Sequence, residues 1–347
     1  MKPRSLFRTA ALATALSIGL TGCLAGENAS TSADTVATDG ATEGGTLNID
    51  FATYNPLSLV IKEQGWLEDE LGKQDITVNW VQSAGSNKAN EALRAGAIDV
   101  GSTAGSAALL ARSNGSPIKA IDIYSQPEWA ALVALPGSGI ESVEDLRGKS
   151  VAATKGTDPY FFLLQALESA GIDQSEVEVQ NLQHADGRAA LASGAVDAWS
   201  GLDPIMASAE QDGAELFFRN IDFNTYGFLN ATESFLEEKP DVAQTVVNAY
   251  EKAREWAKAN PEETAAILAD VAGIDPAVAS AVIIDRTNLD VEPAPGDAQR
   301  TVLEKIGPVF VETGDVATQA QIDEALDTLF DDSLVKRADP AAIAASS

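Results

Sequence analysis

The stretches EALRAGAID (Glu91–Asp99) and AALASGAVD (Ala189–Asp197) follow one pattern at two places in the chain. Each reads as the end of a helix, a glycine suited to a left-handed helix cap, and the start of a strand. A loop then leads to a further helix, at Gly101–Ser106 in the first copy and at Trp199–Pro204 in the second. The repeat predicts two lobes of similar construction, with equivalent loops at the carboxyl edges of their sheets, where open α/β proteins bind ligands.

Strand-like and helix-like segments alternate on both sides of this repeat. The expected strands are Leu47–Ala52, Ile76–Val81, Ile98–Gly101, Ile118–Ile123, Ser150–Ala153, Val177–Leu182, Val196–Trp199 and Ala214–Phe217. Amphipathic segments separate most of them, which is typical of βα units and a mostly parallel sheet. After Tyr226–Ala231 the pattern is only helical, from Pro240 to Leu329. The sequence therefore predicts an α/β protein of two lobes with a helical C-terminal third.

Residues 1–22 have the pattern of a secretory signal peptide. A basic segment precedes Ala10–Leu20, eleven apolar or small residues, which are too few to cross a bilayer. The following Cys23 ends an LTGC sequence that looks like a bacterial lipobox, although a plain signal peptide with an accidental cysteine is the alternative. Residues 23–46, rich in Ala, Ser, Thr and Gly, are expected to form a flexible tether. We therefore expect a protein held by a lipid on Cys23 at the extracytoplasmic face of the cell membrane.

Charge and residue counts exclude several function classes. Among 347 residues, 23 Lys and Arg stand against 52 Asp and Glu, a formal charge of −29, which disfavours a nucleic-acid partner. Cys23 and His184 are the only residues of their kinds, so neither an internal disulfide nor a Cys/His metal cluster can form. We expect His184 in a turn rather than against a ligand. The chain is expected to be a monomer without metal or cofactor.

Three helix starts carry an Asx-Pro step, at Asn55-Pro56, Asp158-Pro159 and Asp203-Pro204. Asn and Asp cap helices well, and proline fits the first helical position, where its missing N–H has no partner to lose. The remaining free N–H groups and the helix dipole favour an anion. Each of these steps can equally be an ordinary helix cap.

Two segments of small and hydroxyl residues would let a ligand approach the backbone. They are GSTAGS (Gly101–Ser106) and TKGTD (Thr154–Asp158), and neither matches a P-loop. Nearby, Arg188 has the fork geometry to bind two oxygens of an oxyanion, or it is a solvated helix charge that pairs with Asp186. These residues predict a site for a small anion and leave its exact composition open.

Four segments together resemble the aliphatic sulfonate/taurine/nitrate-type substrate-binding proteins of ABC importers. They are NLQHADGRAALASGAVDAWSGLDP (Asn181–Pro204), TKGTDPYFFLLQALESAG (Thr154–Gly171), NEALRAGAIDVG (Asn90–Gly101) and SVEDLRGK (Ser142–Lys149). The resemblance covers essentially Leu47 to about Leu334, and the lipobox and the tether agree with it.

The resemblance implies a type II periplasmic-binding fold, in which two lobes joined by two crossing strands close on a ligand. We expect the crossings near Ala130–Leu135 and Tyr226–Ala231. Lobe 1 is then expected to comprise 47–134 and 230–335, lobe 2 to comprise 135–229, and 336–347 to be a C-terminal tail.

The family's ligand cleft, carried over by position, implies a set of binding residues in this chain. They are Tyr54, Asn55, Ser102, Thr103, Ala104, Gly105, Ser106, Gly156, Thr157, Asp158, Asp186, Gly187, Arg188, Trp199 and Asp203. Of these, Tyr54 and Trp199 can be either core residues or walls of the cleft. One loop departs from the family: where sulfonate binders usually have a TGDAP-like sequence, this chain has Thr103–Ser106 without the Asp or the Pro.

The function implied by the resemblance is capture of a small anionic solute, such as an aliphatic sulfonate or taurine. The protein would deliver the solute to a permease, which in turn works with a cytoplasmic ATPase. Because of the altered loop, nitrate, bicarbonate, a pyrimidine precursor or an aromatic acid remain alternatives. The rival class is an enzyme of the same fold, as in relatives that make the thiamine pyrimidine. Those relatives use a cysteine-rich motif and an active-site histidine that this sequence lacks, so we do not expect an enzyme.

Overall fold

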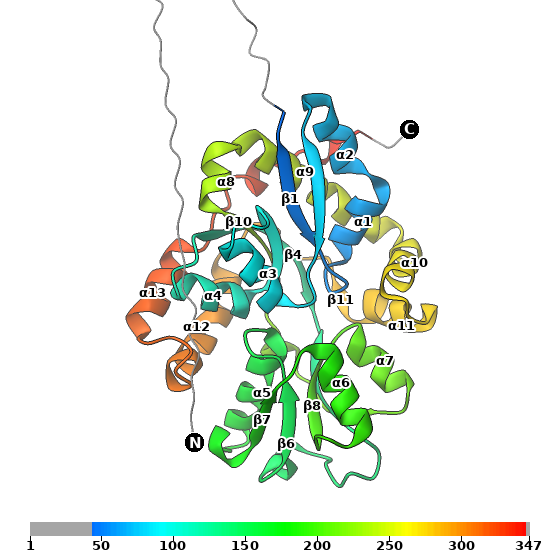
Figure 1. Cartoon of the computed structure of the whole chain (residues 1–347), viewed down its shortest axis with the longest axis vertical. Helices are drawn as coiled ribbons and strands as arrows, with labels where there is room; N and C mark the ends of the chain where they lie inside the picture. The colour runs from blue at the N-terminus through cyan, green and yellow to red at the C-terminus, as the bar shows by residue number, and fades with distance from the viewer. Residues whose placement is uncertain (1–43, 345–347) are drawn as a thin grey trace, which may run out of the picture. The chain divides into compact units, whose positions relative to one another are not determined.

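The computed structural model describes residues 44–344 (Figure 1). The expected signal peptide, most of the expected tether and the expected lipidation of Cys23 lie outside the described residues. Within residues 44–344, no helix combines the length and the apolar character that a membrane crossing requires.

The first lobe is built on a six-stranded sheet. Its strands are β1 (Thr46–Phe51), β2 (Thr77–Gln82), β3 (Val100–Ala104), β4 (Ile118–Pro127), β10 (Gly227–Thr232) and β11 (Thr287–Asn288). Their order is β11-β4-β10-β3-β1-β2. The β1 strand is parallel to β2 and β3, whereas β10 runs antiparallel between β3 and β4.

The second lobe repeats this plan in a five-stranded sheet, which carries the green residues of Figure 1. Its strands are β5 (Ala130–Ala134), β6 (Ser150–Ala153), β7 (Glu178–Asn181), β8 (Ala198–Leu202) and β9 (Glu215–Phe218). Their order is β7-β6-β8-β5-β9, with β6 parallel to β7 and β8 and with β5 antiparallel to β8. In both lobes, therefore, a strand that arrives from the other lobe pairs antiparallel with the strand that follows the sequence repeat.

The sequence repeat is also a structural repeat. Gly96 and Gly194 both adopt the left-handed conformation, with φ of 65° and 71°. The aspartate that ends each copy then makes the same contact, because the carboxylate of Asp99 accepts from the N–H of Asn48 at 2.8 Å, and that of Asp197 accepts from the N–H of Ser150 at 2.8 Å. These side chains fasten each incoming strand to its parallel neighbour, and the prediction of two similar α/β lobes is confirmed.

The structure places two of the lobe boundaries at other residues than we predicted. We expected lobe 1 to run to residue 134 and lobe 2 to run to residue 229, but β5 (Ala130–Ala134) pairs within the second sheet and β10 (Gly227–Thr232) pairs within the first. The chain therefore crosses between lobes just before each of these strands. A wholly buried strand has no polar face, and its sequence cannot show which sheet it joins.

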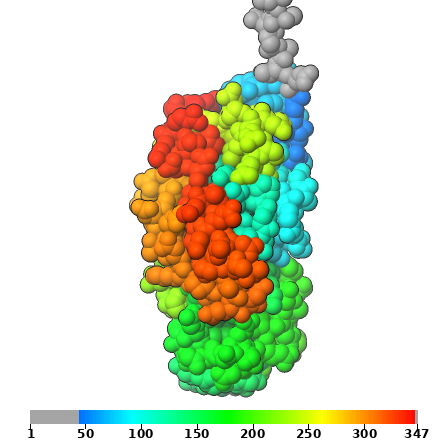
Figure 2. All heavy atoms as spheres, turned by 90° about the vertical axis from the view of Figure 1, so that its left-hand side faces the viewer, coloured from blue at the N-terminus to red at the C-terminus, as the bar shows by residue number. Residues whose placement is uncertain are grey.

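Helices cover both sheets. They are α1 (Pro56–Gln64), α2 (Trp66–Leu71), α3 (Ser86–Arg94), α4 (Gly105–Ser113), α5 (Asp158–Ser169), α6 (His184–Ser193), α7 (Ile205–Gln211), α8 (Glu233–Glu238), α9 (Pro240–Ala259), α10 (Pro261–Ala272), α11 (Pro276–Ser280), α12 (Asp297–Glu312) and α13 (Gln319–Thr328). A turn of π-helix, Ala281–Asp285, follows α11. The C-terminal part is helical as predicted, and Figure 2 shows its orange and red segments together on one face, where α12 and α13 pack against α4.

The segment that we expected as a C-terminal tail packs on the first lobe as far as it is described. Ile343 is 3% exposed, and the Nζ of Lys252 in α9 donates to its carbonyl oxygen at 2.7 Å. The 336–344 part of the chain therefore belongs to the folded unit.

Candidate functional site

A narrow hollow, with no room for a water molecule in this structure, lies where the two lobes meet, and we call it the interlobe hollow. Its lining residues come from both lobes and from the first crossing: Tyr54, Ser86, Ala104, Trp129, Thr157, Asp158, Pro159 and Leu202. Tyr54, Ala104, Thr157 and Asp158 were among the predicted site residues, and the structure brings these four together. Ser86 and Trp129 were missed, although Ser86 stands in the same small-residue context as the predicted helix starts.

Three helices begin at this hollow. Ser86 is the first residue of α3, Ala104 is the N-cap of α4, and Thr157 is the N-cap of α5. The first N–H groups of a helix have no partner within the helix, and the helix dipole places partial positive charge there. The first N–H groups of α4 are already used, because Gly105 donates to the carbonyl oxygen of Tyr226 at 2.9 Å and Ser106 donates to the hydroxyl of Thr225 at 3.2 Å. The starts of α3 and α5, one in each lobe, leave backbone donors at the interlobe hollow from two sides, which favours a negatively charged group.

Aromatic rings close one side of the hollow. Tyr54, which immediately precedes the N-cap of α1, packs edge-on against Trp129 with 6.1 Å between ring centres. Its hydroxyl donates to the carbonyl oxygen of Ser102 at 3.0 Å, which fixes the ring. The structure therefore makes Tyr54 a wall of the hollow. Asn55 is buried beneath it, where its side chain caps α1 and its amide donates to the hydroxyl of Tyr250 at 3.1 Å.

The carboxylate of Asp158 joins the two lobes. One oxygen accepts from the hydroxyls of Ser106 (2.6 Å) and Thr225 (2.7 Å), and the other accepts from the indole N–H of Trp129 (2.8 Å) and the N–H of Thr225 (2.7 Å). Burial raises the pKa of Asp158, although these hydrogen bonds act to lower it. A carboxylate has about four acceptor positions, so all of them are filled by the protein. Asp158 thus acts as a tie between α4, α5 and both crossings rather than as a free contact for a solute.

The loop before α4 is mainly structural. Both the N–H and the hydroxyl of Ser102 donate to Asp50, at 2.9 and 3.0 Å, and burial raises the pKa of Asp50 to about 7. The hydroxyl of Thr103 accepts from the amide of Asn230 at 2.8 Å. A Cβ at Gly105 would lie 2.8 Å from the Phe228 ring, so only glycine fits there. Within this predicted segment, Ala104 alone lines the hollow, whereas the side chains of Ser102, Thr103 and Ser106 are engaged with other protein groups.

Four predicted residues of the second lobe lie outside the hollow. Trp199 is 1% exposed and belongs to the apolar core of that lobe, and a Cβ at Gly187 would lie 2.7 Å from its Nε1. The guanidinium of Arg188 is paired with Asp212 at 2.5 Å, and Asp186 is exposed. Trp199 lies in this core because side chains alternate between the two faces of a strand. Its place in β8 turns the side chain toward α6 rather than toward the first lobe.

Asp203 lines a second narrow hollow next to the first. Both of its oxygens accept from Nη1 of Arg286, at 3.2 and 3.1 Å, and Nη2 of Arg286 contacts Glu210. Burial raises the pKa of Asp203 to about 6, although Arg286 acts to lower it. Asp203 and Glu210 belong to the second lobe, whereas Arg286 follows the π-helix and its carbonyl accepts from the N–H of Glu128 at 2.8 Å. This buried ion pair fastens the lobes, and no sequence motif marked Arg286.

Gly156 lies beside the interlobe hollow with a φ of 76°, a left-handed conformation in which other residues are strained. It lines an adjoining groove together with Asn87. The glycine therefore shapes the turn into α5 at the edge of the site.

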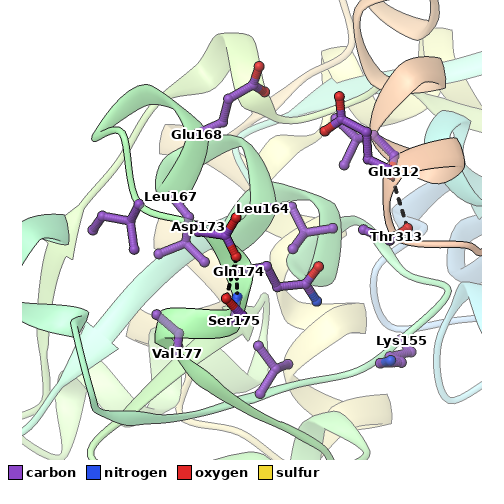
Figure 3. Close-up of a pocket in the computed structure, with 13 residues that line it drawn as sticks. Lys155, Leu164, Leu167, Glu168, Asp173, Gln174, Ser175, Val177, Glu312 and Thr313 are labelled. Atoms are coloured by element: carbon purple, nitrogen blue, oxygen red, sulfur yellow. Dashed lines mark hydrogen bonds between the residues drawn. The ribbon is translucent and has the colours of Figure 1, made fainter.

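A wider groove lies between α5 and α12 (Figure 3). Glu168, Asp173 and Glu312 contribute carboxylates to its lining, and Lys155 is the one lysine or arginine among its lining residues. Asp173 is engaged in capping, with Ser175 as its partner at 2.8 Å, as the dashed lines of Figure 3 show. Such a rim repels anions, which makes the interlobe hollow the better candidate for a small negative solute.

Comparison with known proteins identifies the family of this chain. Residues 57–264 match the model of the family described as NMT1/THI5 like. The chain belongs to the NMT1/THI5-like family. The match runs from α1 to α10 and so includes both sheets' central strands and every lining residue of the interlobe hollow except Tyr54.

Two sequence relatives are named aliphatic sulfonates-binding proteins. The one from Escherichia coli (strain K12) is 29% identical over 219 residues, which cover 62% of this chain and 69% of the relative. The one from Bacillus subtilis (strain 168) is 28% identical over 229 residues, 65% of this chain and 69% of the relative. The predicted resemblance to this type of binding protein is confirmed.

Solved structures confirm the periplasmic-binding fold. The periplasmic aliphatic sulphonate binding protein SsuA from Escherichia coli has a TM-score of 0.70 at 25% identity, covering 83% of this chain and 92% of that one. The alkanesulfonate-binding protein SsuA from Xanthomonas axonopodis pv. citri bound to MOPS has a TM-score of 0.72 at 23% identity, covering 81% and 97%. The desulfurization enzyme DSZB shares the fold at 14% identity with a TM-score of 0.62, covering 84% and 98%.

Proposed function

We propose that this chain is the substrate-binding protein of an ABC importer, which holds a small anionic solute between its lobes and delivers it to the permease. One observation carries the proposal: three helices from both lobes begin at one hollow that aromatic rings close on one side. Donors from two lobes can grip one anion only when the lobes are together, so the solute would stabilise the closed form.

An aliphatic sulfonate is the solute class that we propose first. The names of the Escherichia coli and Bacillus subtilis relatives support it. A sulfonate stays ionised at all ordinary pH values, and N–H donors at helix starts suit it. The side of the hollow formed by Tyr54 and Trp129 would then cover a short alkyl chain.

The same proposal fixes where the protein works. A lipid on Cys23 would hold it at the extracytoplasmic face of the membrane, with the segment between Cys23 and β1 as the tether, and it would act as a monomer without a cofactor. The permease, and through it the ATPase, would be its protein partners.

A matched ligand panel tests the proposal. Calorimetry and thermal shift would compare ethanesulfonate, butanesulfonate, taurine, nitrate and sulfate with ethanesulfonamide, which has the shape of the sulfonate without its charge. We expect an alkanesulfonate at one hundred times its Kd to stabilise the protein by about 2.7 kcal/mol. The sulfonamide should leave the melting temperature unchanged. Binding of the sulfonamide as tight as that of the sulfonate, or binding of no anion in the panel, would contradict the proposal.

A further inference from the structure

The chain's one histidine lies at the boundary between the lobes. His184 is the first residue of α6 in the second lobe and is 1% exposed. Its Nε2 and Cδ2 lie 2.9 and 3.2 Å from the position that a Cβ on Gly85 would occupy, and Gly85 is the N-cap of α3 in the first lobe. The imidazole edge of one lobe therefore rests against the start of a helix of the other.

The hydrogen bonds around the ring fix where its proton sits. The hydroxyl of Thr154 donates to the carbonyl oxygen of Leu182 at 2.7 Å, so toward Nδ1 of His184, 3.2 Å away, it can act only as an acceptor. The neutral ring thus carries its proton on Nδ1, and Nε2 is left as an acceptor. Within the described residues Nε2 has no hydrogen-bond partner, and neither has Oδ1 of Asn87, which lies 2.9 Å from the same Cβ position.

An unpaired polar atom that is this deeply buried marks a position where a partner is missing. The start of α3 supplies the other half of a site, because the N–H groups of Ser86 and Asn87 precede the first bonds within the helix, which Lys88 and Ala89 make to Gly85. These donors and the helix dipole favour an anion. A neutral His184 would oppose that anion with a lone pair, whereas a doubly protonated ring would donate to it from Nε2.

We propose that His184 is a solute-contacting residue, whose protonated Nε2 donates to the oxyanion of the solute at the start of α3. This inference rests on the proposed function. It adds His184 as a binding residue and the uptake of a proton on binding. The anion lies between the imidazole of His184 and Gly85. The lobes therefore close slightly less far around the solute than they do in this structure. The amide of Asn87 turns its Nδ2 toward the same oxyanion.

Solute binding then takes up a proton. Burial, as the sole contribution, lowers the pKa of His184 to about 4, so the empty closed protein holds the ring neutral. The charged residues on the adjoining segments, Lys88, Lys155 and Asp186, are exposed to solvent. An anion against Nε2 favours the charged ring and raises its pKa. Affinity for the solute therefore rises by up to tenfold per pH unit as the pH falls from the raised pKa of the solute-bound ring toward about 4, and it changes little above that raised pKa.

Nuclear magnetic resonance on the unaltered chain tests this directly. Because the chain has one histidine, the imidazole ¹⁵N signals of a protein purified without a histidine tag report His184 alone. In the absence of solute we expect Nδ1 to carry the proton at pH 6. With saturating ethanesulfonate we expect a doubly protonated ring and a pKa raised by at least two units. Unchanged signals in the presence of bound sulfonate would overturn the role of His184.

Two variants give a second, independent readout by calorimetry in buffers of different ionisation enthalpy. His184→Asn keeps a donor for Thr154 and removes Nε2, and we expect about tenfold weaker sulfonate binding at pH 5 with no proton uptake. Gly85→Ala places a methyl group in the solute's position and should weaken binding at every pH. Proton uptake by His184→Asn equal to that of the unaltered chain would overturn the inference. If the unaltered chain binds no anion, the proposed function fails and this inference falls with it; if it binds with no change at His184, only the inference falls.

Discussion

Replacement of Asp158 by asparagine should lower the free energy of unfolding by about 3–5 kcal/mol. The carboxylate accepts four hydrogen bonds from Ser106, Trp129 and Thr225, and asparagine would turn an NH₂ group toward two of these donors. Buried donors left without an acceptor lose about 1–3 kcal/mol each, and a broken buried charge network loses about 3–5 kcal/mol. Urea unfolding of the purified protein at pH 7 measures the effect.

Asp186→Asn is the matched control for this prediction. It makes the same chemical change on an exposed side chain of the second lobe and should leave the urea midpoint unchanged. Equal midpoints for the Asp158 variant and the unaltered protein would show that Asp158 does not tie the lobes together.

Replacement of Arg286 by methionine should lower the free energy of unfolding by a similar amount, about 3–5 kcal/mol, because it leaves Asp203 buried without its partner. The loss should depend on pH. Burial already raises the pKa of Asp203 to about 6, and without Arg286 that pKa rises further. A group whose pKa is raised on folding stabilises the protein when it is protonated and loses that contribution as the pH rises. The variant should therefore be much less stable at pH 8 than at pH 5.

A double-mutant cycle separates the ion pair from other effects of the arginine. Adding Asp203→Asn to Arg286→Met should restore part of the stability, since the uncompensated charge is then gone. Arg188→Met, which removes an exposed pair with Asp212, is the comparison and should change stability by less than about 1 kcal/mol. A loss of stability that does not depend on pH, or the absence of rescue by Asp203→Asn, would contradict a stabilising ion pair between Arg286 and Asp203.

The two-lobed fold could be predicted because its decisive signals are local. The glycine that ends each repeated helix lies three residues before the aspartate that fastens the next strand, and in both lobes the glycine adopts the left-handed conformation that the pattern predicts. The starts of α4 and α5 are also marked by residues close together in sequence, and Ala104 and Thr157 at these starts line the interlobe hollow.

The remainder of the site depends on contacts between distant segments. Arg286 meets Asp203 from 83 residues away, and His184 meets Gly85 only because the lobes close on each other. Arg188 has the right chemistry for an anion, but Asp212, from the segment after α7, takes its guanidinium. Residue type and local pattern show which side chains are able to bind an anion, whereas the packing of the two lobes decides which of them face it.

A crystal structure of the protein with a bound alkanesulfonate is the most direct measurement of the central claim, since the anomalous signal of the sulfur locates the anion. The account predicts the sulfur between the two lobes, with sulfonate oxygens within hydrogen-bond distance of the first N–H groups of α3 and of His184, and the alkyl chain against Tyr54 and Trp129. A sulfonate held in the groove between α5 and α12, or on Arg188 at the surface of the second lobe, would contradict it.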